Sequence, residues 1–193
     1  MNANIGHNDA LRYLIQEYHD GLLLYEVSKR QVWDVAAADT KGLETWYKTH
    51  KADYAWKAPK FKGFIYHCKN AKDAKAVNKM LKKYGAGEWR KQLKQQFNKD
   101  SITVSVSGPY LCSQGENSVI DAYAFKADNN VKQPKGFTMT GVSGKVMKQP
   151  KSYIDVKAQV TSDYQAECER LWVEKLRKQF TFTVNEDVLK TVK

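Results

Sequence analysis

Residues 8–50 show the hydrophobic spacing of α-helices. A first apolar stripe is followed by Ser28 and Gln31, a capping-box pair that predicts the start of a second helix. Asp39 predicts the cap of a third helix. Pro59 closes this helical region, because proline cannot continue a helix. The residues expected to face inward are Leu11, Leu14, Ile15, Tyr18 and Leu22, then Val32, Trp33 and Ala36, then Leu43, Trp46 and Tyr47.

After Pro59 the pattern changes to alternating strands and helices. Ile102, Val104 and Val106 alternate strictly with polar residues, which is typical of a half-buried strand. Glycine and proline mark the loops. The expected elements are a strand at 61–68, helices at 71–84 and 86–98, a strand at 101–107, a loop from Gly108, a helix or turn at 118–125, and strands within 136–147 separated by Gly141 and Gly144.

The helical period returns near residue 162. Its apolar stripe includes Cys168, Leu171 and Trp172, and Phe180 and Phe182 then alternate with threonines as in a strand. Helical ends around an α/β middle predict an α+β fold in which the two ends pack together, because neither end can cover its own stripe. We expect an N-terminal helical segment at 1–56, an inserted α/β domain at 57–158, and a C-terminal helix from 159 to 193 that packs on the N-terminal segment.

The chain is basic, and its charge is concentrated in one stretch. Of a net charge of +11 over 193 residues, almost all lies in residues 57–100, where thirteen lysines and arginines face only three acidic residues. This concentration makes nucleic acid the first alternative partner. A solvated lysine face is the simpler interpretation, and arginine, which phosphate recognition favours, occurs there only as Arg90.

Several functional classes have no support in the sequence. The longest apolar runs are far shorter than the roughly 20 residues that span a bilayer, so no membrane span is expected. The N-terminus lacks the pattern of a signal peptide, which fits a mature or truncated envelope protein as well as a cytoplasmic one. No phosphate-binding loop, dinucleotide fingerprint or zinc-protease motif occurs, and the three cysteines have no metal-ligand spacing. We expect no cofactor and no metal.

Among the four histidines, His67 has the most distinctive setting. His7, His19 and His50 lie among polar residues on or beside predicted helices and are expected to be ordinary surface or partly buried side chains. His67 lies in the predicted strand at 61–68 and precedes a long basic helix. The alternatives are a functional imidazole and a histidine that merely caps the end of the strand.

Three stretches, at 27–33, 43–54 and 59–68, resemble the approach to a parvulin domain in SurA- and PrsA-like folding factors. There a helix precedes a first strand that carries a histidine. The stretches at 155–165, 172–177 and 184–192 resemble the C-terminal part of large peptidyl-prolyl isomerases of the Bacteroidetes type. Residues 115–125 resemble the family's segment that ends in an aromatic residue, here Phe125.

The resemblance implies a proline-binding groove. Isomerisation crosses a barrier of about 18–20 kcal/mol without covalent chemistry, so an apolar slot and a few hydrogen-bonding groups suffice. The family's glycine-rich run is absent before residue 115, and no histidine stands at 136–140, where the family has its second one. The resemblance implies His67 as the catalytic group and a substrate-binding groove lined by Ile120, Tyr123, Phe125 and Met139.

The function that we expect is that of a cell-envelope or periplasmic folding factor. It would bind unfolded or partly folded, proline-containing polypeptides and would retain weak isomerase activity or none. Two alternatives stay open at this stage. One is a basic nucleic-acid-binding module that uses residues 57–100, and the other is a purely structural envelope protein.

Overall fold

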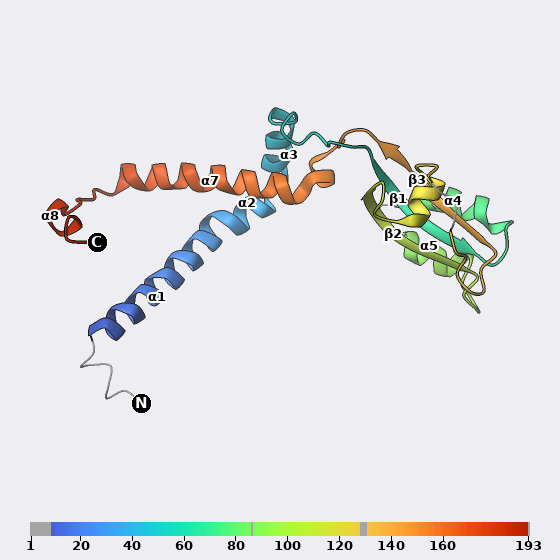
Figure 1. Ribbon diagram of the computed structural model, residues 1–193, viewed down its shortest axis with the longest axis horizontal. Helices are drawn as coiled ribbons and strands as arrows, with labels where there is room; N and C mark the ends of the chain where they lie inside the picture. The colour runs from blue at the N-terminus through green and yellow to red at the C-terminus, as the bar shows by residue number, and fades with distance from the viewer. Residues whose placement is uncertain (1–8, 86, 128–130, 193) are drawn as a thin grey trace. The chain divides into compact units, whose positions relative to one another are not determined.

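The computed structural model describes residues 9–85, 87–127 and 131–192. It combines helices with a three-stranded antiparallel sheet, which confirms the α+β class (Figure 1). The chain forms two compact units. A helical unit contains the described residues up to Tyr54 and those from Ser152 onward, and an α/β unit spans Ala55–Lys151.

The second boundary lies earlier than the sequence pattern predicted. Residues 152–158, expected in the α/β domain, belong to the helical unit. The reason is a local helix start: Ser152 and Asp155 form a reciprocal capping box that opens the short helix η3 (Tyr153–Val156). This turn leads directly into α7 (Lys157–Gln179). His7 and Ala86, which entered the sequence predictions, lie outside the described residues.

The helical unit is organised around α7. Its N-terminal part supplies α1 (Asp9–Ser28), the π-helical turn η2 (Lys29–Trp33), α2 (Asp34–Ala38) and α3 (Thr40–Thr49). The elements η2, α2 and α3 all pack against α7, and the short helix α8 (Glu186–Leu189) follows it. The core residues Val32, Leu43, Tyr47 and Val160 are buried, as their apolar spacing requires.

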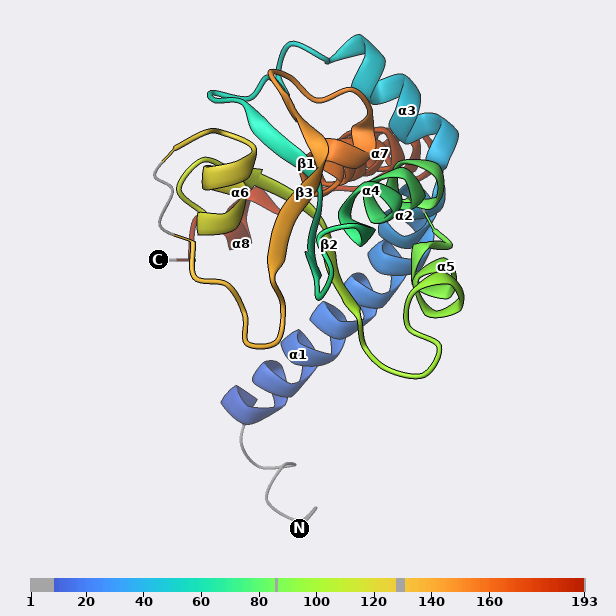
Figure 2. The same ribbon diagram turned by 90° about the vertical axis from the view of Figure 1, so that its right-hand side faces the viewer.

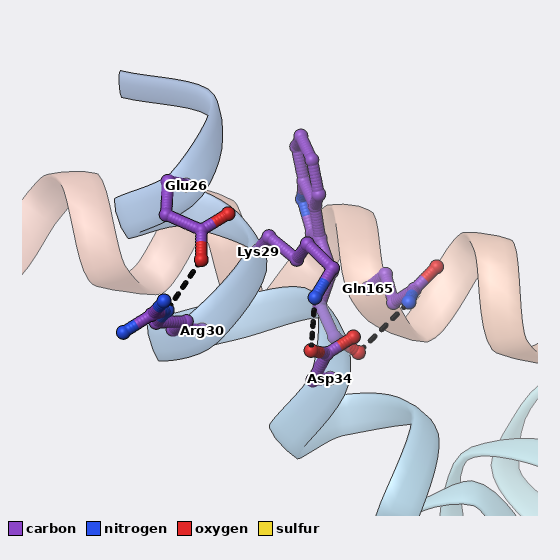
Figure 3. A network of polar contacts seen from close by, with 6 residues as sticks. Glu26, Lys29, Arg30, Asp34 and Gln165 are labelled. Atoms are coloured by element: carbon purple, nitrogen blue, oxygen red, sulfur yellow. Dashed lines mark hydrogen bonds and ion pairs between the residues drawn. The ribbon is translucent and has the colours of Figure 1, made fainter. Parts of the chain in front are cut away.

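Polar contacts fix the junction between η2 and α7. The side chain of Gln165 on α7 donates a hydrogen bond of 2.9 Å to the carbonyl oxygen of Trp33 (Figure 3). The indole of Trp33 donates to Glu169, also on α7, at 3.1 Å. Around this junction, Glu26 pairs with Arg30, and Lys29 pairs with Asp34.

Trp33, Trp46 and Trp172 expose only a minor part of their surface, as expected of inward-facing residues. Two other expectations for the helical unit were wrong. The apolar stripe of α1 is exposed, because α7 packs on η2, α2 and α3. Residues 180–184 form no strand, since no neighbouring strand within the described residues pairs with them.

The sheet of the α/β unit has the order β2-β1-β3. The central strand β1 (Lys60–Cys68) pairs antiparallel with both β2 (Val104–Ser113) and β3 (Met139–Met147). Helices α4 (Asp73–Tyr84) and α5 (Trp89–Gln96) cover one face of the sheet, and α6 (Ser118–Tyr123) lies on the other (Figure 2).

Alternation along β1 divides the core between these faces. Phe64, Tyr66 and Cys68 point toward α4 and α5 and join the larger cluster. Phe61 and Ile65 point the other way and pack with Ile120 of α6. The sheet therefore has two distinct apolar faces, one covered by α4 and α5 and the other by α6.

Two strands run further than the sequence predicted. β2 continues through Gly108 and Pro109, where a loop was expected, because it is an edge strand and a register shift there accommodates the proline. β3 is one strand rather than two. Its glycines admit aromatic rings: a Cβ on Gly141 would lie 2.5 Å from the hydroxyl of Tyr66.

No helix within the described part of the chain combines the length and apolar character needed to cross a membrane.

Candidate functional site

His67 lies at the centre of a polar row that crosses the sheet. Its register partners are Ser105 on β2 and Thr140 on β3. Directly opposed residues of antiparallel strands project to the same side, so all three belong to the face covered by α6. The imidazole is half-buried, whereas Thr140 is only 2% exposed.

A short hydrogen-bond chain orients the imidazole. His67 Nδ1 lies 2.7 Å from Oγ1 of Thr140, and that hydroxyl donates to Oε1 of Gln133 at 2.6 Å. Because the single hydroxyl proton is directed to Gln133, Nδ1 must carry its own proton and donate it. In the neutral ring, the lone pair then resides on Nε2, which can accept a hydrogen bond from a ligand.

Burial favours the neutral form of this imidazole. Desolvation lowers the pKa of His67, since burial penalises the charged ring. The ring of Phe137 lies 5.9 Å from the imidazole, centroid to centroid, and supplies an apolar neighbour. The arrangement offers a neutral hydrogen-bond acceptor beside an aromatic side chain.

The apolar part of this face is held by α6. The side chain of Asn117 caps the helix by accepting hydrogen bonds from the backbone N–H groups of Val119 and Ile120. Asp121 accepts from the N–H of Gly115, whose φ of +93° favours glycine. These contacts set α6 over β1, where Ile120 packs on Phe61 and Ile65.

The structure brings together some of the predicted site residues. His67, Ile120 and Phe125 share the α6 face, and Phe125 is half-buried at the edge of the apolar cluster. Ile120 is completely buried, so it supports the cluster from within and has no surface to line a groove. Tyr123 is 43% exposed at the end of α6.

Met139 does not join this group. It is the register partner of Cys68, whose side chain points toward α4 and α5. By the same pairing rule Met139 projects from the face opposite to His67. The family resemblance implied that Met139 lines one groove with His67, but the register of β1 and β3 places the two on opposite faces of the sheet.

Three residues of the site were not identified from the sequence: Thr140, Gln133 and Phe137. Thr140 becomes visible only when the register of β1 and β3 is known. Gln133 and Phe137 precede β3 in a segment without regular structure, so no periodic pattern marks them. A threonine in a strand is common, so the residue type of Thr140 does not by itself indicate a functional role.

A second polar cluster lies in the helical unit. The indole of Trp46 donates to the hydroxyl of Tyr54, which donates to Asp163 at 2.8 Å. Burial, together with this carboxylate, raises the pKa of Tyr54 to about 12. Tyr164 donates to Asp39, the cap of α3. Each of these side chains forms a hydrogen bond with another residue of the helical unit, so we assign this cluster a structural role.

The remaining chemistry-bearing side chains are dispersed. His19 is exposed beside Asp20, and His50 stacks on Trp46. The three cysteines are free. Within residues 9–85, 87–127 and 131–192, no three histidine, cysteine or acidic side chains gather as a metal site would require.

Comparison with known proteins gave no relative: no protein-family model, curated protein or solved structure matches the chain.

Proposed function

We propose that this protein is a cell-envelope folding factor of the parvulin type that binds non-native, proline-containing polypeptide and has little or no isomerase activity. The observation that supports it best is the hydrogen-bonded pair of His67 and Thr140. This pair shares a sheet face with the apolar cluster around Ile120.

The chemistry of this face suits an extended polypeptide. Nε2 of His67 can accept a hydrogen bond from a backbone N–H, since its ring is neutral and Nδ1 is already engaged. Phe137 and Phe125 are half-buried and offer apolar surface to a proline ring. A few fixed polar groups beside apolar side chains are typical of ligand sites.

Turnover is expected to be poor because the imidazole has no titratable partner within the described residues. Its contacts are the hydroxyl of Thr140 and, through it, the amide of Gln133. Isomerisation requires groups that favour the twisted amide over the planar one. A slightly misplaced catalytic group can cost about 10²-fold in rate. Polypeptide binding tolerates an imprecisely positioned imidazole better than catalysis does.

The proposal is tested by two assays on the same preparation. One follows light scattering of an aggregating, unfolded client, and the other follows protease-free refolding of a client limited by a native cis-proline. We expect the wild-type protein to suppress aggregation and to accelerate refolding only slightly. His67→Ala should weaken the suppression, whereas the matched variant His19→Ala, at an exposed position on α1, should not.

Two results would count against the proposal. Strong acceleration of refolding that disappears in His67→Ala would show an active isomerase. Equal suppression of aggregation by wild type, His67→Ala and a Phe137→Ala variant would show that clients bind elsewhere on the molecule.

A further inference from the structure

Helices α4 and α5 carry a surface of positive charge on the side of the sheet opposite to His67. The buried residues of α4, Ala74, Val77, Met80 and Leu81, all face the sheet. At 3.6 residues per turn, the exposed lysines of α4 fall within one arc on the other side of the helix. We define the basic surface as Lys75, Lys79, Lys82 and Lys83 on α4 with Lys91 and Lys94 on α5.

These lysines have no ion-pair partner among the described residues, in contrast to several cations of the helical unit. There, Glu44 pairs with Lys48, and Arg170 pairs with both Glu167 and Glu174. Interspersed charges of both signs are the usual composition of a soluble surface. The basic surface departs from that composition, so an anionic partner could bind it without breaking an existing ion pair.

The side chains of this surface favour the phosphates of lipid headgroups over single-stranded nucleic acid. Single-stranded nucleic acid is held by exposed aromatic side chains that stack on bases. The aromatic residue of α5, Trp89, is only 5% exposed, and the ring of Tyr84 is half-buried with Lys83 above it. Arginine binds phosphate in a bidentate manner. The described residues of α4 and α5 include one arginine, Arg90, and its guanidinium stacks over Trp89.

We propose that the basic surface binds the anionic headgroups of a lipid bilayer and holds the α/β unit at the membrane surface. Lysine clusters on an amphipathic helix attract anionic lipids through additive, non-directional charge. The arc of α4 exposes lysines and Ala76 but no large apolar side chain, so the attachment is electrostatic and shallow. The polypeptide-binding face around His67 lies on the other side of the sheet and stays accessible.

Flotation of the full chain with lipid vesicles tests this proposal. Vesicles of phosphatidylglycerol and phosphatidylcholine should carry the protein at low salt and release it as the salt concentration rises, because screening weakens exposed charge interactions. Pure phosphatidylcholine vesicles should not carry it. The variant with Lys75, Lys79, Lys82 and Lys83 all changed to Gln should bind at least tenfold more weakly, and changing the same four to Arg should restore binding.

A matched variant distinguishes binding by the basic surface from binding that depends only on the net charge of the protein. Changing Lys41, Lys157, Lys175 and Lys178 to Gln removes the same charge from exposed positions of the helical unit and should leave vesicle binding within twofold. Circular dichroism confirms that each variant is folded, and glutamine suits helix positions. Equal losses in the two four-lysine variants would overturn the proposal. Absence of binding to anionic vesicles at low salt would do so as well, as would tighter binding of duplex DNA or RNA that vesicles cannot displace.

Discussion

The imidazole of His67 is held by a hydroxyl group and not by a second titratable side chain. The hydroxyl of Thr140 accepts a hydrogen bond from Nδ1 and donates one to Oε1 of Gln133. This arrangement fixes the tautomer, since a hydroxyl with its proton already directed elsewhere can only accept. The histidine therefore presents Nε2 as an acceptor, which suits binding of a backbone N–H better than transfer of a proton.

Removal of the Thr140 hydroxyl should weaken both folding and binding. Thr140→Val keeps the size of the buried side chain but leaves Nδ1–H of His67 without its partner. The expected loss is about 1 kcal/mol of unfolding free energy, measured by urea denaturation. Thr138→Val, whose exposed hydroxyl bonds to the carbonyl of Lys69, is the matched control and should lose less. Equal losses in the two variants would contradict the role given to Thr140.

Stability should fall as the pH drops below the unfolded-state pKa of histidine. Burial lowers the folded-state pKa of His67, so the unfolded chain binds its proton first. The contribution of His67 to the unfolding free energy is fully present above about pH 6.5, the usual pKa of an unfolded-state histidine. It is lost as the pH falls through the lowered folded-state pKa. Thermal unfolding midpoints at pH 7.5 and pH 5 should differ less in His67→Gln than in wild type. The His19→Gln variant should show the same difference between the two midpoints as wild type. If that difference shrinks in His19→Gln and not in His67→Gln, His67 is not the group responsible.

Single residues could be predicted only where the sequence itself sets them apart. His67 stood out because a histidine within an apolar strand is unusual, and Phe125 because it ends a recognisable segment. Thr140 and Met139 depended on the register of β1 and β3, which pairs them with His67 and Cys68. A shift of one residue exchanges the faces of a strand, so sequence position alone could not decide which of the two lies beside the histidine.

Glycines set the path of β3 by admitting aromatic rings. Gly141 lies against the ring of Tyr66 on β1, and Gly144 lies opposite Gly63 with Phe61 close by. In the sequence these glycines resembled turn signals, because sequence alone does not distinguish a glycine in a turn from a glycine that packs under an aromatic ring. The positions of the strands and helices followed from periodicity, but the continuity of β2 and β3 depended on contacts with β1.

A methyl group at Gly141 should therefore be costly. Gly141→Ala would place Cβ 2.5 Å from the Tyr66 hydroxyl and displace a ring that belongs to the main core. We expect a loss of about 1–3 kcal/mol in unfolding free energy by chemical denaturation. Gly21→Ala on α1 meets no atom within 4 Å and should be neutral or stabilising. An unchanged stability in Gly141→Ala would show that the ring is not confined.

The two units differ in how they use their surfaces. The helical unit pairs several of its exposed cations, Arg170 among them, and leaves apolar side chains of α1 exposed. The α/β unit carries, on α4 and α5, lysines without an ion-pair partner among the described residues, and it carries His67 and the smaller apolar cluster on the α6 face. The concentration of positive charge in residues 57–100 could be predicted from the sequence. The separation of the lysines from His67 could not, because it depends on which face of the sheet each helix covers.

The most direct test of polypeptide binding at the α6 face is an NMR titration of the isotope-labelled protein with an unfolded, proline-containing polypeptide. Amide resonances of His67, Phe125, Phe137 and Thr140 should shift in a saturable manner, because these residues surround the proposed contact surface. Resonances of Lys75, Lys79 and Lys82 should stay in place, since α4 covers the other face of the sheet. Shifts confined to α4 and α5 or to α1, with none at the four site residues, would contradict the proposed function.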